Sequence, residues 1–114
     1  MTARILTGFA AAVAAGAALF ASPAAAAGDA AAGHKRAAQC SACHGIDGLS
    51  KLPGAPNIAG QAAPYIEKQL RAFRAGERKD ENMTVMTKGL SDEDIANLAA
   101  WYSSIEISVK VPGQ

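Results

Sequence analysis

The chain has 114 residues, half of them hydrophobic, with a formal net charge of +1 from 11 basic and 10 acidic side chains. This length excludes a protein of several domains, and the near-balance of charge gives no indication of nucleic-acid binding. Much of the apolar content lies in residues 1–27 and consists of alanine. Because few large side chains remain for a core, so small a domain is expected to need a further stabilising group.

Residues 1–27 have the layout of a secretory signal peptide. Arg4 provides a positive start, residues 5–20 form an apolar run, and Ala25-x-Ala27 offers small residues for cleavage. The alternative is a retained membrane anchor, but the run is shorter than the roughly 20 residues that a spanning helix needs. The sequence therefore predicts cleavage after Ala27, export from the cytoplasm, and a mature protein without a stable membrane anchor.

The first predicted helix covers the alanine-rich residues 30–39 and leads into a pair of cysteines. A loop is expected over residues 45–60, where glycine and proline are frequent. Pro64 suits the first turn of a second helix, and Gly76 is expected to end it. A polar stretch over residues 77–82 then separates the second helix from the remainder of the chain.

The last predicted helix begins at Ser91, with Asp94 three residues later as the capping-box partner. Its apolar stripe recurs at helical spacing and comprises Ile95, Leu98, Ala99, Tyr102 and Ile105. The sequence thus predicts an all-α domain over residues 28–105, with three main helices and long loops. Residues 106–114 are expected to be a C-terminal extension, to which the sequence assigns no role.

The chemistry lies in the motif Cys40-Ser41-Ala42-Cys43-His44. The spacing C-x-x-C-H is the attachment signature of a c-type haem. Two thiols one helical turn apart can add to the two vinyl groups on one haem edge, and the next residue then places its imidazole beneath the iron. The sequence therefore predicts one covalently bound haem c, attached to Cys40 and Cys43, with His44 as an iron ligand.

Four other interpretations of the cysteine pair stay open. A thioredoxin-like redox disulfide lacks the surrounding βαβ pattern. A zinc site would require His34, the only other histidine, and the chain has no second cysteine pair. A structural disulfide would close a very short loop and stabilise little, and the fourth interpretation is a chance match. The signal peptide, the helical pattern and a downstream methionine all favour haem.

The haem motif is followed in order by the loop residues 55–60, by Met83, and by the segment 90–94 that opens the last helix. This order resembles the small bacterial class I cytochromes c, which include single-haem periplasmic carriers and each half of the two-haem cytochromes. The resemblance covers essentially residues 28–105. With one haem motif in the chain, it implies the single-haem form and a cytochrome c-like fold around that haem.

In that family a histidine and a methionine hold the iron from opposite sides, which implies His44 and either Met83 or Met86. Met83 is preferred because it precedes Ser91 by the family's usual distance. Met86 is the alternative ligand, and its other possible role is to fill a gap in the core. The resemblance also implies that the carbonyl of Pro56 accepts the other N–H of His44, a bond that fixes the ring.

Electron transfer is the function that this ligand set predicts, because filled axial positions leave no open site for a substrate. The protein would then not be an enzyme, and its partners would be periplasmic redox proteins that it meets through small, weak interfaces. Two alternatives stay open. One is a cytochrome subunit of a periplasmic dehydrogenase or oxidase complex, for example a sulfide dehydrogenase. The other is a gas sensor, which would need a readily displaced sixth ligand.

Several further residues are expected to have structural roles. The basic side chains between Lys68 and Lys79 are interpreted as a solvated helix face, with a docking face as the alternative. Trp101 and Tyr102 are expected to be core aromatics at a helix contact, rather than electron relays. His34 is expected on the solvent side of the first helix.

Overall fold

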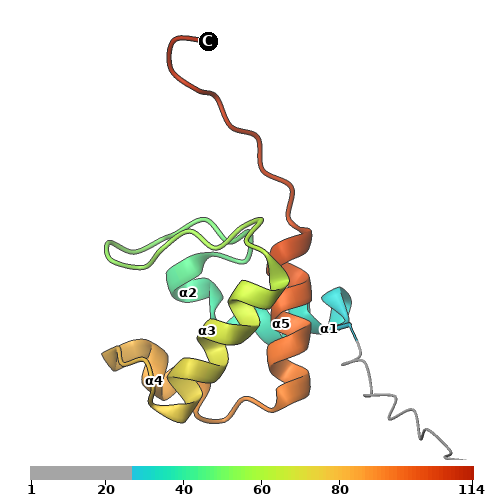
Figure 1. Ribbon diagram of the computed structural model, residues 1–114, viewed down its shortest axis with the longest axis vertical. Helices are drawn as coiled ribbons and strands as arrows, with labels where there is room; N and C mark the ends of the chain where they lie inside the picture. The colour runs from blue at the N-terminus through green and yellow to red at the C-terminus, as the bar shows by residue number, and fades with distance from the viewer. Residues whose placement is uncertain (1–26) are drawn as a thin grey trace, which may run out of the picture.

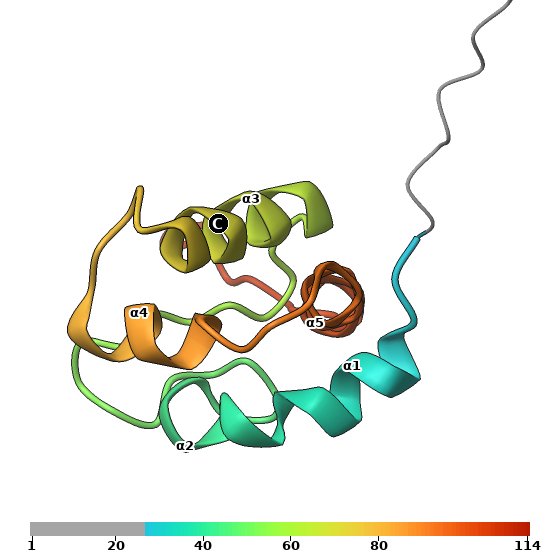
Figure 2. The same cartoon turned by 90° about the horizontal axis from the view of Figure 1, so that it is seen from below.

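The computed structural model describes residues 27–114, so the predicted signal peptide lies almost wholly outside the described residues. Within these residues the chain forms helices and no strand, which confirms the all-α prediction (Figure 1). The elements are α1 (Ala30–Arg36), a short 3-10 helix η1 (Ala37–Gln39), α2 (Ser41–His44), α3 (Ala63–Ala75), α4 (Glu81–Thr87) and α5 (Asp92–Ser104). Figure 2 shows α1 and α3 on opposite sides of α5.

The predicted second and last helices have the expected ends. α3 has a proline in its first turn and stops at Gly76, whose φ of 76° is a left-handed conformation that favours glycine. α5 begins after Ser91, whose side chain accepts the N–H of Asp94 while the Asp94 carboxylate accepts the N–H of Ser91. The predicted capping box is therefore confirmed.

The predicted helix over residues 30–39 is confirmed, although its last three residues form a 3-10 helix. α1 begins after Asp29, whose carboxylate accepts the N–H groups of Ala31 and Ala32. The helix then tightens into η1, as helix ends commonly do. A separate turn of helix, α2, starts at Ser41 and contains the second cysteine of the haem motif.

The helix α4 was not predicted, because seven residues carry too few apolar repeats to reveal a helical period. It begins just inside the stretch that the sequence pattern assigned to a polar connection. The carboxylate of Asp80 accepts the N–H groups of Asn82 and Met83, each at 3.0 Å. An aspartate at this position is a recognised start signal, so the cap was readable from the sequence.

A small apolar core lies between α1, α3 and α5. It consists of Ala37, Ile66, Leu90, Ile95, Leu98, Ala99 and Tyr102. The predicted stripe of α5 is buried at its first four positions, and Ile105 packs against the cluster while half-buried. Two of the seven core residues are alanines, so this cluster supplies little apolar volume, in keeping with the predicted need for a further group.

α1 and α5 cross with their backbones almost in contact. Gly33 of α1 is buried at the crossing. A Cβ atom at this position would lie 1.9 Å from the carbonyl oxygen of Asn97 and 2.9 Å from the Cβ of Trp101. Only glycine permits this approach, because the nearest atom belongs to a backbone that cannot move independently.

Gly33→Ala is expected to lower the free energy of unfolding by about 1–3 kcal/mol, the usual cost of forcing extra volume into a packed site. The clash outweighs the gain in helix propensity of about 1 kcal/mol that alanine brings. Denaturant unfolding followed by circular dichroism measures the difference. Gly89→Ala is the matched control, since a Cβ there meets nothing within 4 Å, and it should stay within about 0.5 kcal/mol of wild type. Equal effects of the two changes would contradict the close crossing.

Candidate functional site

The cysteine pair lies at the single turn of helix α2. Cys40 is the N-cap of this helix and Cys43 lies three residues later, so their side chains fall on neighbouring positions of one face. Both thiols are free and half-buried. Burial raises the pKa of the Cys40 thiol, and the charge of Arg36 opposes this only in part.

His44 is buried, with 7% of its surface exposed. Its Nδ1 atom lies 2.8 Å from the carbonyl oxygen of Pro56. Because a carbonyl can only accept, Nδ1 carries the hydrogen and Nε2 keeps a free lone pair. The contact implied between Pro56 and His44 is therefore present, and it leaves the ring nitrogen that an iron atom would need.

The loop over residues 45–60 is folded so that the Pro56 carbonyl lies over the histidine. Its two arms are joined by bonds from the N–H of Ile58 to the carbonyl of Gly48, at 2.8 Å, and from the N–H of Ser50 to Oδ1 of Asn57, at 2.7 Å. A Cβ on Gly48 would lie 2.6 Å from the nitrogen of Ala59. Glycine at this position therefore lets the arms approach each other.

Two aromatic side chains of α5 hold the segment that follows His44. The hydroxyl of Tyr102 donates to the carbonyl of Gly45 at 3.3 Å, and the indole N–H of Trp101 donates to the carbonyl of Ile46 at 3.0 Å. Burial raises the pKa of Tyr102, so its phenol remains a donor. Tyr102 is a core residue as predicted. Neither bond to the segment after the haem motif was foreseen, because no local pattern signals contacts between residues so distant in sequence.

The indole of Trp101 also contacts His34 of α1, with the ring centroids 4.4 Å apart. His34 is exposed, as expected for the solvent side of the first helix. Within residues 27–114 no group of three histidine, cysteine or acidic residues is placed to hold a metal ion. The zinc interpretation therefore has no ligand set in this part of the chain.

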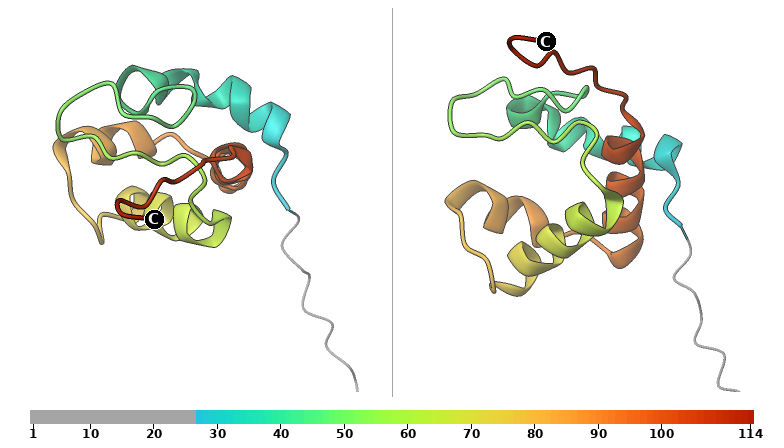
Figure 3. Two further views of the ribbon diagram at one scale, coloured as in Figure 1. Left: turned by 90° about the horizontal axis from the view of Figure 1, so that it is seen from above. Right: turned by 45° about the horizontal axis from the view of Figure 1, so that its top comes forward.

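The two candidate methionines both lie on α4, which the structure places across from α2 and its loop (Figure 3). Met83 is half-buried, whereas Met86 is 40% exposed. The N–H of Met83 donates to Asp80, and its carbonyl accepts a 2.8 Å bond from the hydroxyl of Thr87. Thr87 is buried and was missed by sequence reasoning, because a threonine in a short helix carries no distinctive signal.

Large apolar side chains near the site are left exposed by the folded chain. Ile46, Leu49 and Leu52 belong to the segment after His44, and Val85 and Met86 belong to α4; each is 39% exposed or more. Exposed apolar side chains that gather near one site are a surface that a bound apolar group can cover. Two free thiols, an imidazole with a free nitrogen and these apolar side chains together fit a large, flat, apolar iron complex.

The basic residues of α3 are largely paired, so their interpretation as a solvated face is only partly right. Arg71 and Arg74 both contact the carboxylate of Asp92 at the start of α5, and Arg74 also donates to the carbonyl of Leu90 at 2.9 Å. Arg78, which follows α3, donates to Gln69 of that helix. Arg71 and Arg74 link α3 to the start of α5, and Arg74 also links it to the connection between α4 and α5.

Asp92→Asn is expected to weaken the contact between α3 and the start of α5, by an amount that depends on pH. Hydrogen bonding from Arg74 and the charge of Arg71 hold the pKa of Asp92 below its usual value. Such a carboxylate stabilises the fold fully at pH values above its pKa in the unfolded chain, about 3.9. This stabilisation is lost as the pH falls through the lower pKa of the folded protein. The variant should therefore unfold more easily than wild type at pH 7, by a small margin because the site is exposed, and this margin should vanish in strong acid.

Chemical unfolding of wild type and Asp92→Asn, at pH 7 and in strong acid, measures the difference between their free energies of unfolding. Glu93→Gln, one residue further along the same turn, is the matched control and should show a smaller margin at pH 7. A margin for Asp92→Asn that is the same at both pH values would contradict the ion pairs with Arg71 and Arg74.

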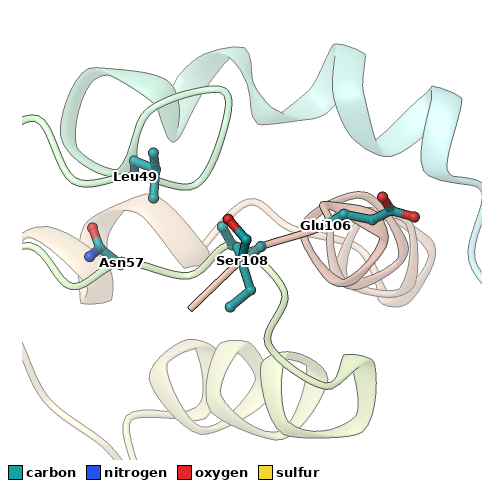
Figure 4. Close-up of a pocket in the computed structure, with 6 residues that line it drawn as sticks. Leu49, Asn57, Glu106 and Ser108 are labelled. Atoms are coloured by element: carbon teal, nitrogen blue, oxygen red, sulfur yellow. The ribbon is translucent and has the colours of Figure 1, made fainter. Parts of the chain in front are cut away.

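The C-terminal extension leaves α5 and passes the loop after α2 (Figure 1). A shallow cavity of about 420 Å³ lies between Leu49, Asn57 and Ala59 of the loop and residues 106–108 of the extension (Figure 4). A Cβ on Gly60 would lie 3.2 Å from the carbonyl oxygen of Ile105, so the start of the extension rests against the end of this loop.

A family model described as "Cytochrome c" matches residues 13–106, and the chain therefore belongs to the cytochrome c family. It is 54% identical over 83 residues to cytochrome c-554(548) of Halomonas halodenitrificans, covering 70% of this chain and all of that protein. It is 48% identical over 84 residues to cytochrome c4 of Pseudomonas aeruginosa, covering 74% of this chain and 42% of that one. The chain thus spans the whole of the first relative but less than half of the second.

The structural comparison agrees. A crystal structure of reduced cytochrome c4 from Pseudomonas stutzeri matches with a TM-score of 0.67 and 44% identity, covering 73% of this chain and 48% of that chain. A protein of Thiomonas intermedia called "Thiosulfate dehydrogenase electron acceptor" is 40% identical over 75 residues, covering 65% of this chain and 35% of that protein. The resemblance to small bacterial class I cytochromes c is therefore confirmed, and the chain is an electron-transfer protein with covalently bound haem c.

None of the helices described in residues 27–114 has the length and apolar character needed to cross a membrane.

Proposed function

We propose that this protein is a single-haem carrier of one electron at a time, in which Cys40 and Cys43 hold the haem and His44 and Met83 bind its iron. The observation that carries the proposal is the bond of His44 Nδ1 to the Pro56 carbonyl, which leaves Nε2 available. A histidine oriented in this way is a stronger ligand, because the acceptor fixes the ring and raises its basicity.

Met83 is the better candidate for the sixth ligand. Its backbone is held on both sides, by Asp80 and by the buried Thr87, and its side chain is half-buried. Met86 is 40% exposed and lies next to the still more exposed Val85. Of the two methionines, Met83 is the more sheltered from water, and its N–H and its carbonyl both have side-chain partners.

A bound haem with histidine and methionine ligands supplies an iron that exchanges single electrons at a raised reduction potential. His44 and Met83 would be the protein ligands of that iron, and with both bound neither oxygen nor a small substrate would have a free position at the metal. The bonds from Tyr102 and Trp101 of α5 hold the segment next to His44 still. A site that changes little between its two redox states suits rapid electron exchange.

The mature protein is proposed to begin near Gly28 and to act in the periplasm, with residues 28–105 as the cytochrome domain. The layout of residues 1–27 supports export. Its partners are proposed to be periplasmic redox proteins. The printed name of the Thiomonas relative describes an electron acceptor of thiosulfate dehydrogenase. That name gives some support to the alternative, in which this chain serves a sulfur-oxidising or other dehydrogenase as a bound cytochrome subunit.

The test is to mix the purified protein with redox partners of known behaviour. The reduced protein is expected to deliver one electron per chain to a small outer-sphere oxidant. With thiosulfate or sulfide and an excess of that oxidant it should show no sustained turnover, because the proposed ligands leave no position at the iron for a substrate. Continuous oxidation of either sulfur compound by the isolated chain would contradict the carrier proposal. A stable partner that copurifies from periplasmic extracts would favour the subunit alternative.

A further inference from the structure

Two polar side chains are buried among the described residues, His44 and Thr87. His44 has a proposed role at the iron, whereas Thr87 is 1% exposed on a seven-residue helix that otherwise faces solvent over much of its surface. Burial of a hydroxyl is unfavourable unless it forms a hydrogen bond. The partner of this hydroxyl is the carbonyl oxygen of Met83, at 2.8 Å.

Thr87 is itself fixed by a path of hydrogen bonds that leads back to α3. Its carbonyl accepts the N–H of Leu90 at 3.1 Å, and the carbonyl of Leu90 accepts a 2.9 Å bond from Arg74. Leu90 is buried in the core, and Arg74 is held by Asp92. The end of α4 is thus fixed to α3 and α5. The Thr87 hydroxyl links Met83 to this fixed end through its hydrogen bond.

The other end of α4 is held less firmly. The Met83 N–H donates to the carboxylate of Asp80, but Asp80 is exposed, and water can replace its carboxylate as the acceptor. The bond from Thr87 is part-buried and its donor is 1% exposed, and a bond sheltered from water is more costly to lose than an exposed one. The bond from Thr87 is therefore the contact that holds Met83 more firmly than an ordinary residue of a short, exposed helix is held.

We propose that Thr87 is a positioning residue that keeps the Met83 thioether in place at the iron; this inference rests on the proposed ligation by Met83. The branched side chain of Thr87 has few allowed rotamers, so its hydroxyl stays directed at the carbonyl one turn earlier. Without this bond, the turn of α4 that bears Met83 adopts other conformations more often, and an added ligand can take the vacated position.

The experiment measures how readily imidazole displaces methionine from the oxidised haem protein, by the loss of the methionine–iron absorption band. Thr87→Val keeps the branched shape and removes the hydroxyl. We expect imidazole to bind this variant about threefold to tenfold more tightly than wild type, which is the range for one lost hydrogen bond. Thr87→Ser retains the hydroxyl and should remain within about twofold of wild type.

The matched control is Thr84→Val, the same change on the same helix. The Thr84 hydroxyl accepts the N–H of Asp80, so its bond is not to Met83. This variant should also remain within about twofold of wild type. If Thr87→Val does not accumulate, Thr87→Ala adds no volume and carries the same expectation.

Three outcomes would overturn the proposal. Wild-type affinity for imidazole in Thr87→Val would show that the hydroxyl does not hold Met83. An equal gain in Thr84→Val would show that α4 is loosened generally. A gain in Thr87→Ser as large as in Thr87→Val would show that the methyl group, not the hydroxyl, is required. Failure of the ligand assignment itself is distinguishable, because the methionine–iron band would then be absent from wild type or would survive Met83→Ala.

Discussion

Met83→Ala is expected to abolish the methionine–iron absorption band, to lower the reduction potential, and to let carbon monoxide bind the reduced iron. The thioether favours the reduced state, so its removal should shift the potential downward by on the order of 100 mV or more, within the roughly 0.8 V range that axial ligands control. Absorption spectra with and without carbon monoxide, together with a redox titration, measure the three effects.

Met86→Ala is the matched control on the same helix. It should keep the band and the potential, and it should cost less than the roughly 2–5 kcal/mol typical of a buried methionine, because Met86 is 40% exposed. If Met86→Ala abolishes the band while Met83→Ala keeps it, the two assignments must be exchanged. Retention of the band in both variants would remove the methionine from the ligand set.

The paired change Cys40→Ala and Cys43→Ala is expected to leave a protein without covalent haem that accumulates poorly. The apolar core of the described residues is small, and exposed apolar side chains on the segment after His44 and on α4 would lose the group that covers them. A denaturing gel stained for haem peroxidase activity tests the attachment. Wild type should keep its stain, the single variants should be attached through one sulfur and accumulate poorly, and the paired variant should show no stain.

Intact-mass measurement provides a second reading of the same prediction. The wild-type mass should equal that of the chain from about Gly28 plus one haem. Loss of haem from wild type on denaturation alone would contradict attachment through Cys40 and Cys43. A mass that includes residues 1–27 in an exported, haem-loaded protein would contradict the proposed cleavage.

Some parts of the fold depend on signals within a few residues of sequence, and these parts were predictable. The start of α5 follows from the reciprocal bonds of Ser91 and Asp94, and the end of α3 follows from the freedom of Gly76 to adopt a positive φ. Both signals act within a few residues, so the sequence pattern displays them directly. The change from the α-helix α1 to the 3-10 helix η1 has no such local signal in the sequence.

The residues of the candidate site also fall into those that the sequence could predict and those that it could not. Cys40, Cys43 and His44 are contiguous, and the chemistry of haem attachment requires this spacing. Trp101 contributes through a contact with Ile46, 55 positions away in the chain, which exists only after the helices have packed. The bond from Thr87 to Met83 is local, but the burial of Thr87 is a result of packing and has no signal in the sequence.

We propose that a single haem bound by two protein ligands makes this protein an electron carrier. The most direct test is an optical redox titration of the wild-type protein, followed by exposure of its reduced form to carbon monoxide. We expect one reversible one-electron step and a reduced spectrum that carbon monoxide leaves unchanged. A wild-type protein whose reduced iron binds carbon monoxide readily would have an open or easily displaced sixth position, and that result would contradict the electron-carrier proposal.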